Sequence, residues 1–121
     1  MSRLAPVVLI VDDDQDTREL YEWALSREGL TIFTMADAEA ALRCIADVQP
    51  DVIVTDLSMP GRVDGYELIR QLYGRRVIAL TAWADPVHIV RAVAAGCTTV
   101  LLKPCAPDTL ALAIRSLLVS A

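Results

Sequence analysis

The stretch Val52-Ile53-Val54-Thr55-Asp56-Leu57-Ser58-Met59-Pro60-Gly61 decides the fold of this chain. Its first four residues are β-branched, which is typical of a strand that is covered on both faces. The run ends in a lone aspartate, Asp56, and the residues after it favour a turn. An acidic side chain therefore lies at the carboxyl end of a buried strand.

Two other apolar runs also end in charged residues. Val7–Val11 precedes Asp12, Asp13 and Asp14, and Val100–Leu102 precedes Lys103. If all three runs are parallel strands of one sheet, these carboxylates and the ammonium group meet Asp56 at its carboxyl edge. That edge is where open α/β sheets bind ligands. We therefore predict a charged site there.

Strand-like and helical patterns alternate along the whole chain. Apolar, β-branched runs occur at about 7–11, 31–34, 52–55, 77–80 and 98–102. Between them, apolar residues recur at helical spacing. The stripes are Leu20, Tyr21, Ala24 and Leu25; Ala38, Ala41, Leu42 and Ile45; Leu68, Ile69 and Leu72; Val87, Val90, Val93 and Ala94; and Leu110, Ile114, Leu117 and Leu118. Five βα units predict a parallel sheet with helices on both faces, with the mixed run 31–34 at an edge.

Local signals agree with these boundaries. Asp85 followed by Pro86 is typical of a helix start, with proline at the first helical position. Pro107 can open the last helix, and Gly29 and Gly96 lie where helices should end.

Composition excludes several classes of protein. The chain has 121 residues, of which 55% are hydrophobic, so one domain with a substantial core is expected. The net charge of −5 argues against nucleic-acid binding, because no basic stripe could neutralise phosphates. No apolar stretch is long enough to span a membrane. Cys44, Cys97 and Cys105 lack metal-type spacing and predict reduced thiols, two of them buried, in a cytoplasmic protein.

Over about residues 6–119 the chain resembles the receiver domains of bacterial two-component response regulators. The matching segments are Val8–Asp14, Val54–Gly61, Asp64–Leu68, Leu80–Ala82, Ala95–Gly96 and Leu101–Pro104. Each motif alone is weak, but their order and spacing are specific. The resemblance implies a single doubly wound, flavodoxin-like (βα)5 domain over residues 1–121, with a five-stranded parallel sheet in the order 2-1-3-4-5 and no output domain.

The resemblance also implies a metal site. A hard divalent cation such as Mg²⁺ prefers oxygen ligands and keeps several waters. Asp13, Asp56 and the main-chain carbonyl of Ser58 would bind Mg²⁺ or Mn²⁺ directly, and Asp12 would act through a bound water or from the outer shell.

The same resemblance assigns Asp56 as the acceptor of a phosphoryl group. Lys103 would pair with the phosphoryl oxygens as a mobile point charge, and Thr81 would donate its hydroxyl to them. Ala82 and Trp83, directly after Thr81, would modulate the site. The Lys103–Pro104 peptide bond is expected to be cis.

The implied partner is a sensor histidine kinase or a histidine phosphotransfer protein, and phosphorylation would switch the binding of a downstream protein. His88, the only histidine, lies on a predicted surface helix and is interpreted as a solvated or packing residue, not as the phosphodonor. A homodimer could form through the face made by helix four, strand five and helix five. The protein would be no enzyme beyond promoting its own phosphorylation and dephosphorylation.

Some of these residues also have ordinary structural interpretations. An acidic residue after a strand often caps the next helix, and we prefer that interpretation for Asp14. Tyr21, Trp23 and Tyr73 are expected to be packing residues.

Several positions depart from the usual receiver pattern. The loop 60–65 is one residue longer than the commonest form, which would place Arg62 near the site or a partner helix. Val100 stands where receivers usually have an aromatic switch residue, and Thr98 and Thr99 stand where acids are frequent. We hypothesise that the indole of Trp83 covers the phosphoryl group. Trp83→Ala should then shorten the half-life of the phosphorylated protein, and an unchanged half-life would refute the idea.

Two alternatives remain open. A degenerate receiver would bind partners constitutively and would not be phosphorylated on Asp56. An enzyme of the aspartyl-phosphate phosphatase class also places an aspartate after a strand, but it generally needs a second acid two residues later. Here that residue is Ser58.

Overall fold

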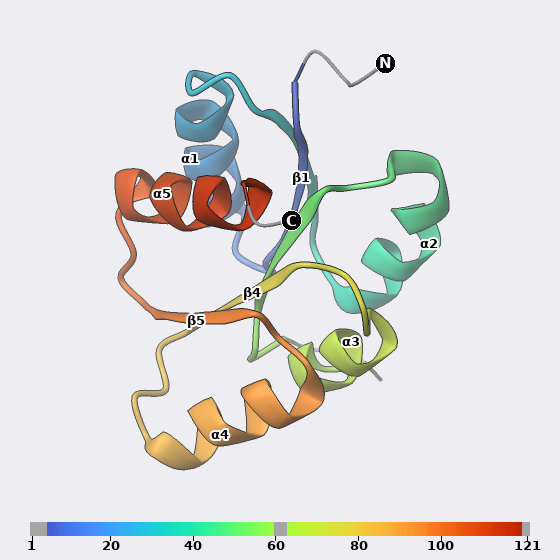
Figure 1. Cartoon of the computed structure of the whole chain (residues 1–121), viewed down its shortest axis with the longest axis vertical. Helices are drawn as coiled ribbons and strands as arrows, with labels where there is room; N and C mark the ends of the chain where they lie inside the picture. Colours follow the sequence, from blue (N-terminus) through green and yellow to red (C-terminus); the bar gives the residue numbers. More distant parts are fainter. Residues whose placement is uncertain (1–4, 60–62, 120–121) are drawn as a thin grey trace.

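The computed structural model describes residues 5–59 and 63–119, and strands alternate with helices throughout (Figure 1). The elements are β1 (Val7–Val11), α1 (Gln15–Ser26), β2 (Thr31–Met35), α2 (Ala38–Val48), β3 (Val52–Asp56), α3 (Gly65–Gln71), β4 (Val77–Thr81), α4 (Pro86–Ala95), β5 (Thr99–Leu102) and α5 (Pro107–Leu118). The predicted alternation of strands and helices is confirmed.

All the strand pairs are parallel, and the sheet order is β2-β1-β3-β4-β5, as predicted. The register brings the strand ends together: Val11 pairs with Thr55, Asp56 pairs with Leu80, and Thr81 pairs with Leu102. The residues that follow β1, β3, β4 and β5 therefore share one edge of the sheet.

Side chains alternate across the sheet, so each central strand contributes to two cores. On one face, Leu9, Ile53 and Val77 pack with α2, α3 and α4. On the other face, Ile10 and Val54 pack with α1 and α5. Figure 1 shows these two helical layers on opposite sides of the strands. Strand β2 lies at an edge and is half-exposed, as its mixed composition predicts.

Helix ends follow the local chemistry. Asp14 caps α1 by accepting a hydrogen bond from the backbone N–H of Thr17, which confirms the structural interpretation of this acid. Asp85 caps α4 before Pro86, and Gly96 ends that helix with φ +118°. Gly29 has φ +84° and lies in the turn that directly follows α1, whose last helical residue is Ser26.

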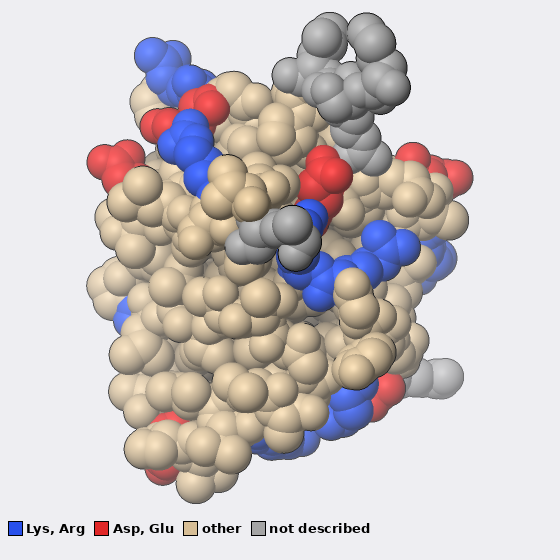
Figure 2. Space-filling model, viewed as in Figure 1, with Lys and Arg blue, Asp and Glu red and all other residues tan. Residues whose placement is uncertain are grey.

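The stripe predicted to bury α4 faces solvent instead. Val87, Val90 and Val93 are 68%, 67% and 57% exposed, whereas Ala92 and Ala95 are buried against the sheet. Both faces of this helix are apolar, so periodicity alone could not show which face packs inward. Small alanines let α4 lie close to the sheet, and its valines form an uncharged surface over α4 and β5 (Figure 2).

Three smaller predictions need correction or comment. Tyr21 is a packing residue as expected, but Trp23 is exposed on α1 and Tyr73 is exposed in the turn after α3. The three cysteines are free, but only Cys97 is buried, because Cys44 and Cys105 lie at the margins of the two cores. Among residues 5–59 and 63–119, no helix has the length and apolar character needed to cross a membrane.

Candidate functional site

Asp56 ends β3 and is 8% exposed, so its carboxylate is set into the edge of the sheet. One oxygen, Oδ1, accepts a hydrogen bond from the backbone N–H of Ser58 at 3.1 Å. The other, Oδ2, lies 2.9 Å from Nζ of Lys103. Strand and turn thus fix the orientation of a nearly buried carboxylate.

Lys103 bridges two carboxylates across the sheet edge. Its Nζ lies 2.9 Å from Oδ2 of Asp12 and 2.9 Å from Oδ2 of Asp56. Burial by itself lowers the pKa of Lys103, but the hydrogen bonds to Asp12 and Asp56 and their negative charges outweigh it and raise the pKa. The ammonium group is therefore kept charged. The peptide bond between Lys103 and Pro104 is cis, the isomer that the resemblance to receiver domains implied.

Asp12, Asp13 and Asp56 form an acidic cluster. Each offers a carboxylate oxygen, and these oxygens lie within 4.8 Å of one another. Asp12 is 2% exposed and its Oδ1 also accepts the Asp14 N–H at 2.9 Å, whereas Asp13 is exposed. The donor set is entirely oxygen, which suits a hard divalent cation. The predicted role of the Ser58 carbonyl as a ligand stays a prediction.

Thr81 ends β4, next to Asp56 in the sheet, and its side chain is buried. Its Oγ1 accepts a hydrogen bond from the backbone N–H of Trp83 at 2.9 Å. Ala82 is exposed and lines a cleft of about 400 Å³ together with Lys103 and Pro104. Asp56, the neighbouring acids, Thr81 and Lys103, which the sequence singled out, are thus brought to one edge.

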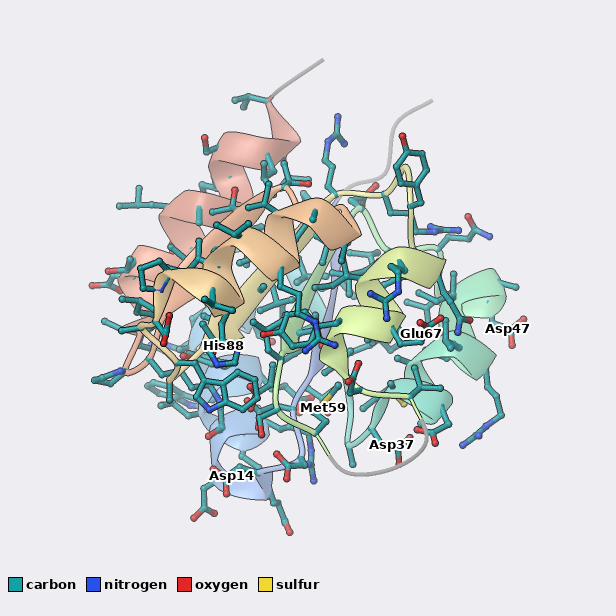
Figure 3. The ribbon with its side chains drawn as sticks, turned by 90° about the horizontal axis from the view of Figure 1, so that it is seen from below. Asp14, Asp37, Asp47, Met59, Glu67 and His88 are labelled. Carbon is teal, nitrogen blue, oxygen red and sulfur yellow. The ribbon has the colours of Figure 1, made fainter. Side chains whose placement is uncertain are left out.

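The ring of Trp83 packs toward α4. Its centroid lies 4.5 Å from that of His88, which is labelled in Figure 3, a view onto the carboxyl edge of the sheet. His88 Nδ1 lies 2.9 Å from the hydroxyl of Tyr66. His88 is therefore a packing residue, one of its two predicted roles. That Trp83 also covers a phosphoryl group stays a prediction.

Two residues that support the site were missed in the sequence. Arg18 donates from Nη1 to the main-chain carbonyl of Asp12 at 2.8 Å. Tyr21 donates its hydroxyl to the carbonyl of Cys105 at 2.7 Å and so anchors the segment after Lys103. Both contacts are made to backbone atoms, so neither residue's partner could be read from the sequence.

Two departures from the usual receiver pattern, Val100 and the longer loop 60–65, have different outcomes in the structure. Val100 is half-buried and packs against the core beneath α4. Residues 60–62, and with them the predicted position of Arg62, lie outside the described residues.

Comparison with known proteins points to one family. A sequence family described as the response regulator receiver domain matches residues 8–115. The transcriptional regulatory protein AfsQ1 of Streptomyces coelicolor is 33% identical over 118 residues, covering 93% of this chain and 51% of AfsQ1. The chain thus spans about half the length of the curated relatives it matches.

Solved structures agree with this result. The chemotaxis protein CheY4 of Vibrio cholerae has a TM-score of 0.87 and 28% identity, and the match covers 93% of this chain and 98% of CheY4. The receiver domain of a signal transduction histidine kinase from Syntrophus aciditrophicus has a TM-score of 0.85 and 32% identity. That match covers 94% of this chain and 90% of the other.

Proposed function

This chain belongs to the response regulator receiver domains of two-component signal transduction, and on that basis we propose that Asp56 accepts a phosphoryl group from a histidine of a partner protein. The observation that carries the proposal is the Lys103 ammonium group, held 2.9 Å from both Asp12 and Asp56 beside the exposed Asp13. Positioning and charge stabilisation are what phosphoryl transfer chiefly requires.

The transfer exchanges one bond to phosphorus for another. A carboxylate oxygen of Asp56 forms the new P–O bond while the P–N bond of the donor phosphohistidine breaks. The bonding pair returns to the imidazole nitrogen, which takes a proton from water. The product is an aspartyl phosphate, and attack by water later returns the free carboxylate and inorganic phosphate.

A divalent cation, Mg²⁺ or Mn²⁺, would neutralise the charge that gathers on the phosphoryl oxygens. Asp13, Asp56 and the carbonyl of Ser58 are the residues we assign to hold it, with Asp12 behind them. Without the cation, the carboxylates of Asp12 and Asp13 would repel an incoming phosphoryl group. We therefore expect phosphorylation to require the metal.

Lys103 and Thr81 are assigned to the phosphoryl group once it has been transferred. In this structure Lys103 pairs with Asp56 Oδ2, and in the product the same ammonium group would pair with a phosphoryl oxygen. Thr81 lies on the neighbouring strand and would donate its hydroxyl proton. These new contacts would shift the segment after β4 and so change the binding of a downstream protein.

The proposed donor is a sensor histidine kinase or a histidine phosphotransfer protein. We also propose the uncharged surface of α4 and β5 as the face for a downstream protein or a homodimer, because Val87, Val90 and Val93 are exposed there. Turnover of external phosphate esters is not proposed, since Ser58 stands where such an enzyme needs a second acid.

The proposal is tested by intact-mass measurement after incubation with Mg²⁺ and acetyl phosphate. The wild type should gain the mass of one phosphoryl group, and Asp56→Asn should gain none. Asp14→Asn is a matched control, because asparagine caps a helix as well as aspartate does and the acceptor is untouched. It should be phosphorylated like the wild type.

A wild type that gains no mass from acetyl phosphate or from a phosphorylated histidine donor, while its circular dichroism shows an intact fold, would contradict the proposal. A degenerate receiver that binds its partners constitutively would then be the better interpretation. Phosphorylation of Asp56→Asn would instead show that the acceptor is a different residue.

A further inference from the structure

Three aromatic side chains from three segments form a stack beside the site. Tyr66 comes from α3, Trp83 from the loop after β4, and His88 from α4. The ring centroids of Trp83 and His88 are 4.5 Å apart, and each lies 6.5 Å from that of Tyr66. The hydroxyl of Tyr66 is 2.9 Å from Nδ1 of His88, so the stack has a hydrogen bond as well as ring contacts.

The stack is connected to the site at two points. The backbone N–H of Trp83 donates to Oγ1 of Thr81 at 2.9 Å, so the residue that carries the indole is bonded to the hydroxyl of the site. Tyr66 follows Gly65, whose N–H donates to the carbonyl of Leu57 at 3.3 Å, directly after Asp56. Movement of the Thr81 hydroxyl is therefore transmitted to the stack directly through Trp83.

The stack is also connected to α4, through residues in the first two turns of the helix. His88 lies in the first turn, and Arg91, one turn further on, places its guanidinium carbon 3.8 Å from the centroid of the Tyr66 ring. A cation over an aromatic face is attracted by the ring. The buried residues of α4, Ala92 and Ala95, lie in its second half.

We propose that the stack of Tyr66, Trp83 and His88 couples the hydroxyl of Thr81 to helix α4. This inference rests on the function proposed above and specifies how phosphorylation at Asp56 would be transmitted. Val100, which is half-buried against the same core, has no polar group that could take part in such a connection.

The physical basis is a change in one hydrogen bond. In this structure the Thr81 hydroxyl oxygen accepts from Trp83. When the hydroxyl turns to donate to a phosphoryl oxygen, the direction of its lone pairs changes and the position of Trp83 must follow. Because the indole packs on His88, each arrangement of Thr81 favours its own arrangement of α4. A ligand shifts such an equilibrium only through contacts that differ between the two states.

Plain packing is the competing explanation, and it makes a different prediction. If the stack only fills space, then removing the Tyr66 hydroxyl or the His88 ring would alter stability but would not alter how α4 responds to the site. The response of α4 is therefore the quantity to measure.

The experiment uses ¹⁵N-labelled protein of the full chain with Mg²⁺ and beryllofluoride, a phosphoryl mimic. Amide shifts are recorded with and without the mimic for the site and for the α4 residues Val87–Ala95. In the wild type, the amide signals of the site residues and of α4 should both move when the mimic is added. In Tyr66→Phe and in His88→Ala the site should still shift, and the shifts in α4 should be lost.

Tyr73→Phe is the matched control for Tyr66→Phe, because it removes a tyrosine hydroxyl that is 84% exposed and outside the stack. It should respond like the wild type. Tyr66→Phe keeps the ring and its volume, so it keeps the test valid if His88→Ala does not fold.

The coupling would be overturned if the α4 amide signals of Tyr66→Phe and His88→Ala moved on addition of beryllofluoride as much as those of the wild type, with normal changes at the site. The proposed function would still stand. No shift at the site in the wild type would instead contradict the proposed function, and the coupling would fall with it. Failure of the coupling and failure of the proposed function are therefore distinguished by whether the amide signals of the site residues move in the wild type.

Discussion

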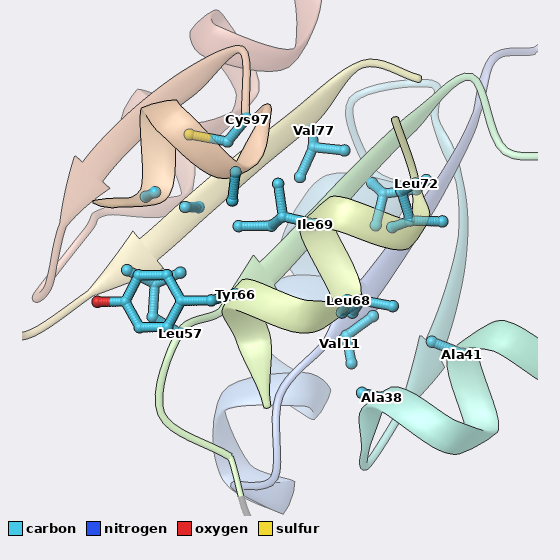
Figure 4. Packing of buried hydrophobic residues seen from close by; sticks show 14 of the residues in the cluster. Val11, Ala38, Ala41, Leu57, Tyr66, Leu68, Ile69, Leu72, Val77 and Cys97 are labelled. Atoms are coloured by element: carbon cyan, nitrogen blue, oxygen red, sulfur yellow. The ribbon is translucent and has the colours of Figure 1, made fainter. Parts of the chain in front are cut away.

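Helices α3 and α4 pack on the same face of the sheet, yet large side chains hold one and small side chains hold the other. Helix α3 buries Leu68 and Ile69 completely, and Figure 4 shows them in the packed cluster. Helix α4 buries Ala92 and Ala95 and exposes its valines. Burial of a leucine or isoleucine contributes about 1.5–3 kcal/mol, and an alanine far less. Packing therefore fixes α3 much more firmly than α4.

This difference fits the positions of the two helices relative to the site. Helix α3 begins at Gly65, whose Cα lies so close to Asp56 and Leu57 that a Cβ there would overlap the Asp56 carbonyl oxygen. Helix α4 begins at Pro86, after the loop that contains Trp83. A firmly packed helix can keep Asp56 in place, while a loosely packed helix can change position when the site changes.

The largest expected effect compares a buried residue of α3 with an exposed residue of α4. Ile69→Ala should lower the free energy of unfolding by about 2–5 kcal/mol, because it leaves a cavity in the core. Val90→Ala, at a residue 67% exposed, should change it by no more than about 0.5 kcal/mol. Urea denaturation followed by circular dichroism measures both. Equal losses would mean that α4 is packed as firmly as α3.

A smaller effect compares the first residues of the two helices. Gly65→Ala should cost about 1–3 kcal/mol, because its methyl group would overlap the backbone of Asp56 and Leu57. It should also slow phosphorylation by acetyl phosphate, since the acceptor would be displaced. Pro86→Ala is the counterpart in α4 and should cost only about 0.4–1 kcal/mol, through greater freedom of the unfolded chain. Normal phosphorylation of Gly65→Ala would show that α3 does not position the acceptor.

Aspartate caps begin both helices, so equal changes can be made in each. Asp64 accepts from the N–H of Glu67 at 2.9 Å, and Asp85 accepts from that of Val87 at 3.0 Å. Replacing either by alanine should cost about 1 kcal/mol. The rates of amide hydrogen exchange in the two helices should distinguish the two variants. Asp85→Ala should speed exchange across α4, whereas α3 should stay protected in Asp64→Ala because its large buried side chains remain. If hydrogen exchange became faster by the same factor in α3 of Asp64→Ala and in α4 of Asp85→Ala, packing would not hold α3 more firmly than α4.

Local patterns predicted the parallel sheet and the site, whereas the strand order came from the resemblance to receiver domains. β-branched runs mark covered strands, and the acids and the lysine directly follow them, so parallel strands had to bring Asp12, Asp56 and Lys103 together. The direction in which α4 faces could not be predicted, since valines and alanines both repeat at helical spacing. The contact between Tyr66 and His88 could not be predicted either, because it depends on how closely α3 and α4 approach each other.

The smallest expected effect concerns the pH dependence of stability at Tyr66, where the two helices meet. Burial raises the pKa of its hydroxyl above the ordinary 10.0; Arg91 opposes this rise and Asp64 adds to it. Because the folded-state pKa is the higher one, the stability linked to this group is complete below pH 10.0 and is lost as pH rises through the folded-state value.

The unfolding free energy of the wild type should therefore fall more steeply above pH 10.0 than that of Tyr66→Phe. Urea denaturation of both proteins on each side of that pH measures the difference in slope, and any constant offset reports only the lost hydrogen bond. Equal slopes for wild type and Tyr66→Phe would mean that the Tyr66 hydroxyl meets water in the folded protein. The junction between α3 and α4 would then be open, and the contact between the helices would be weaker than the stack implies.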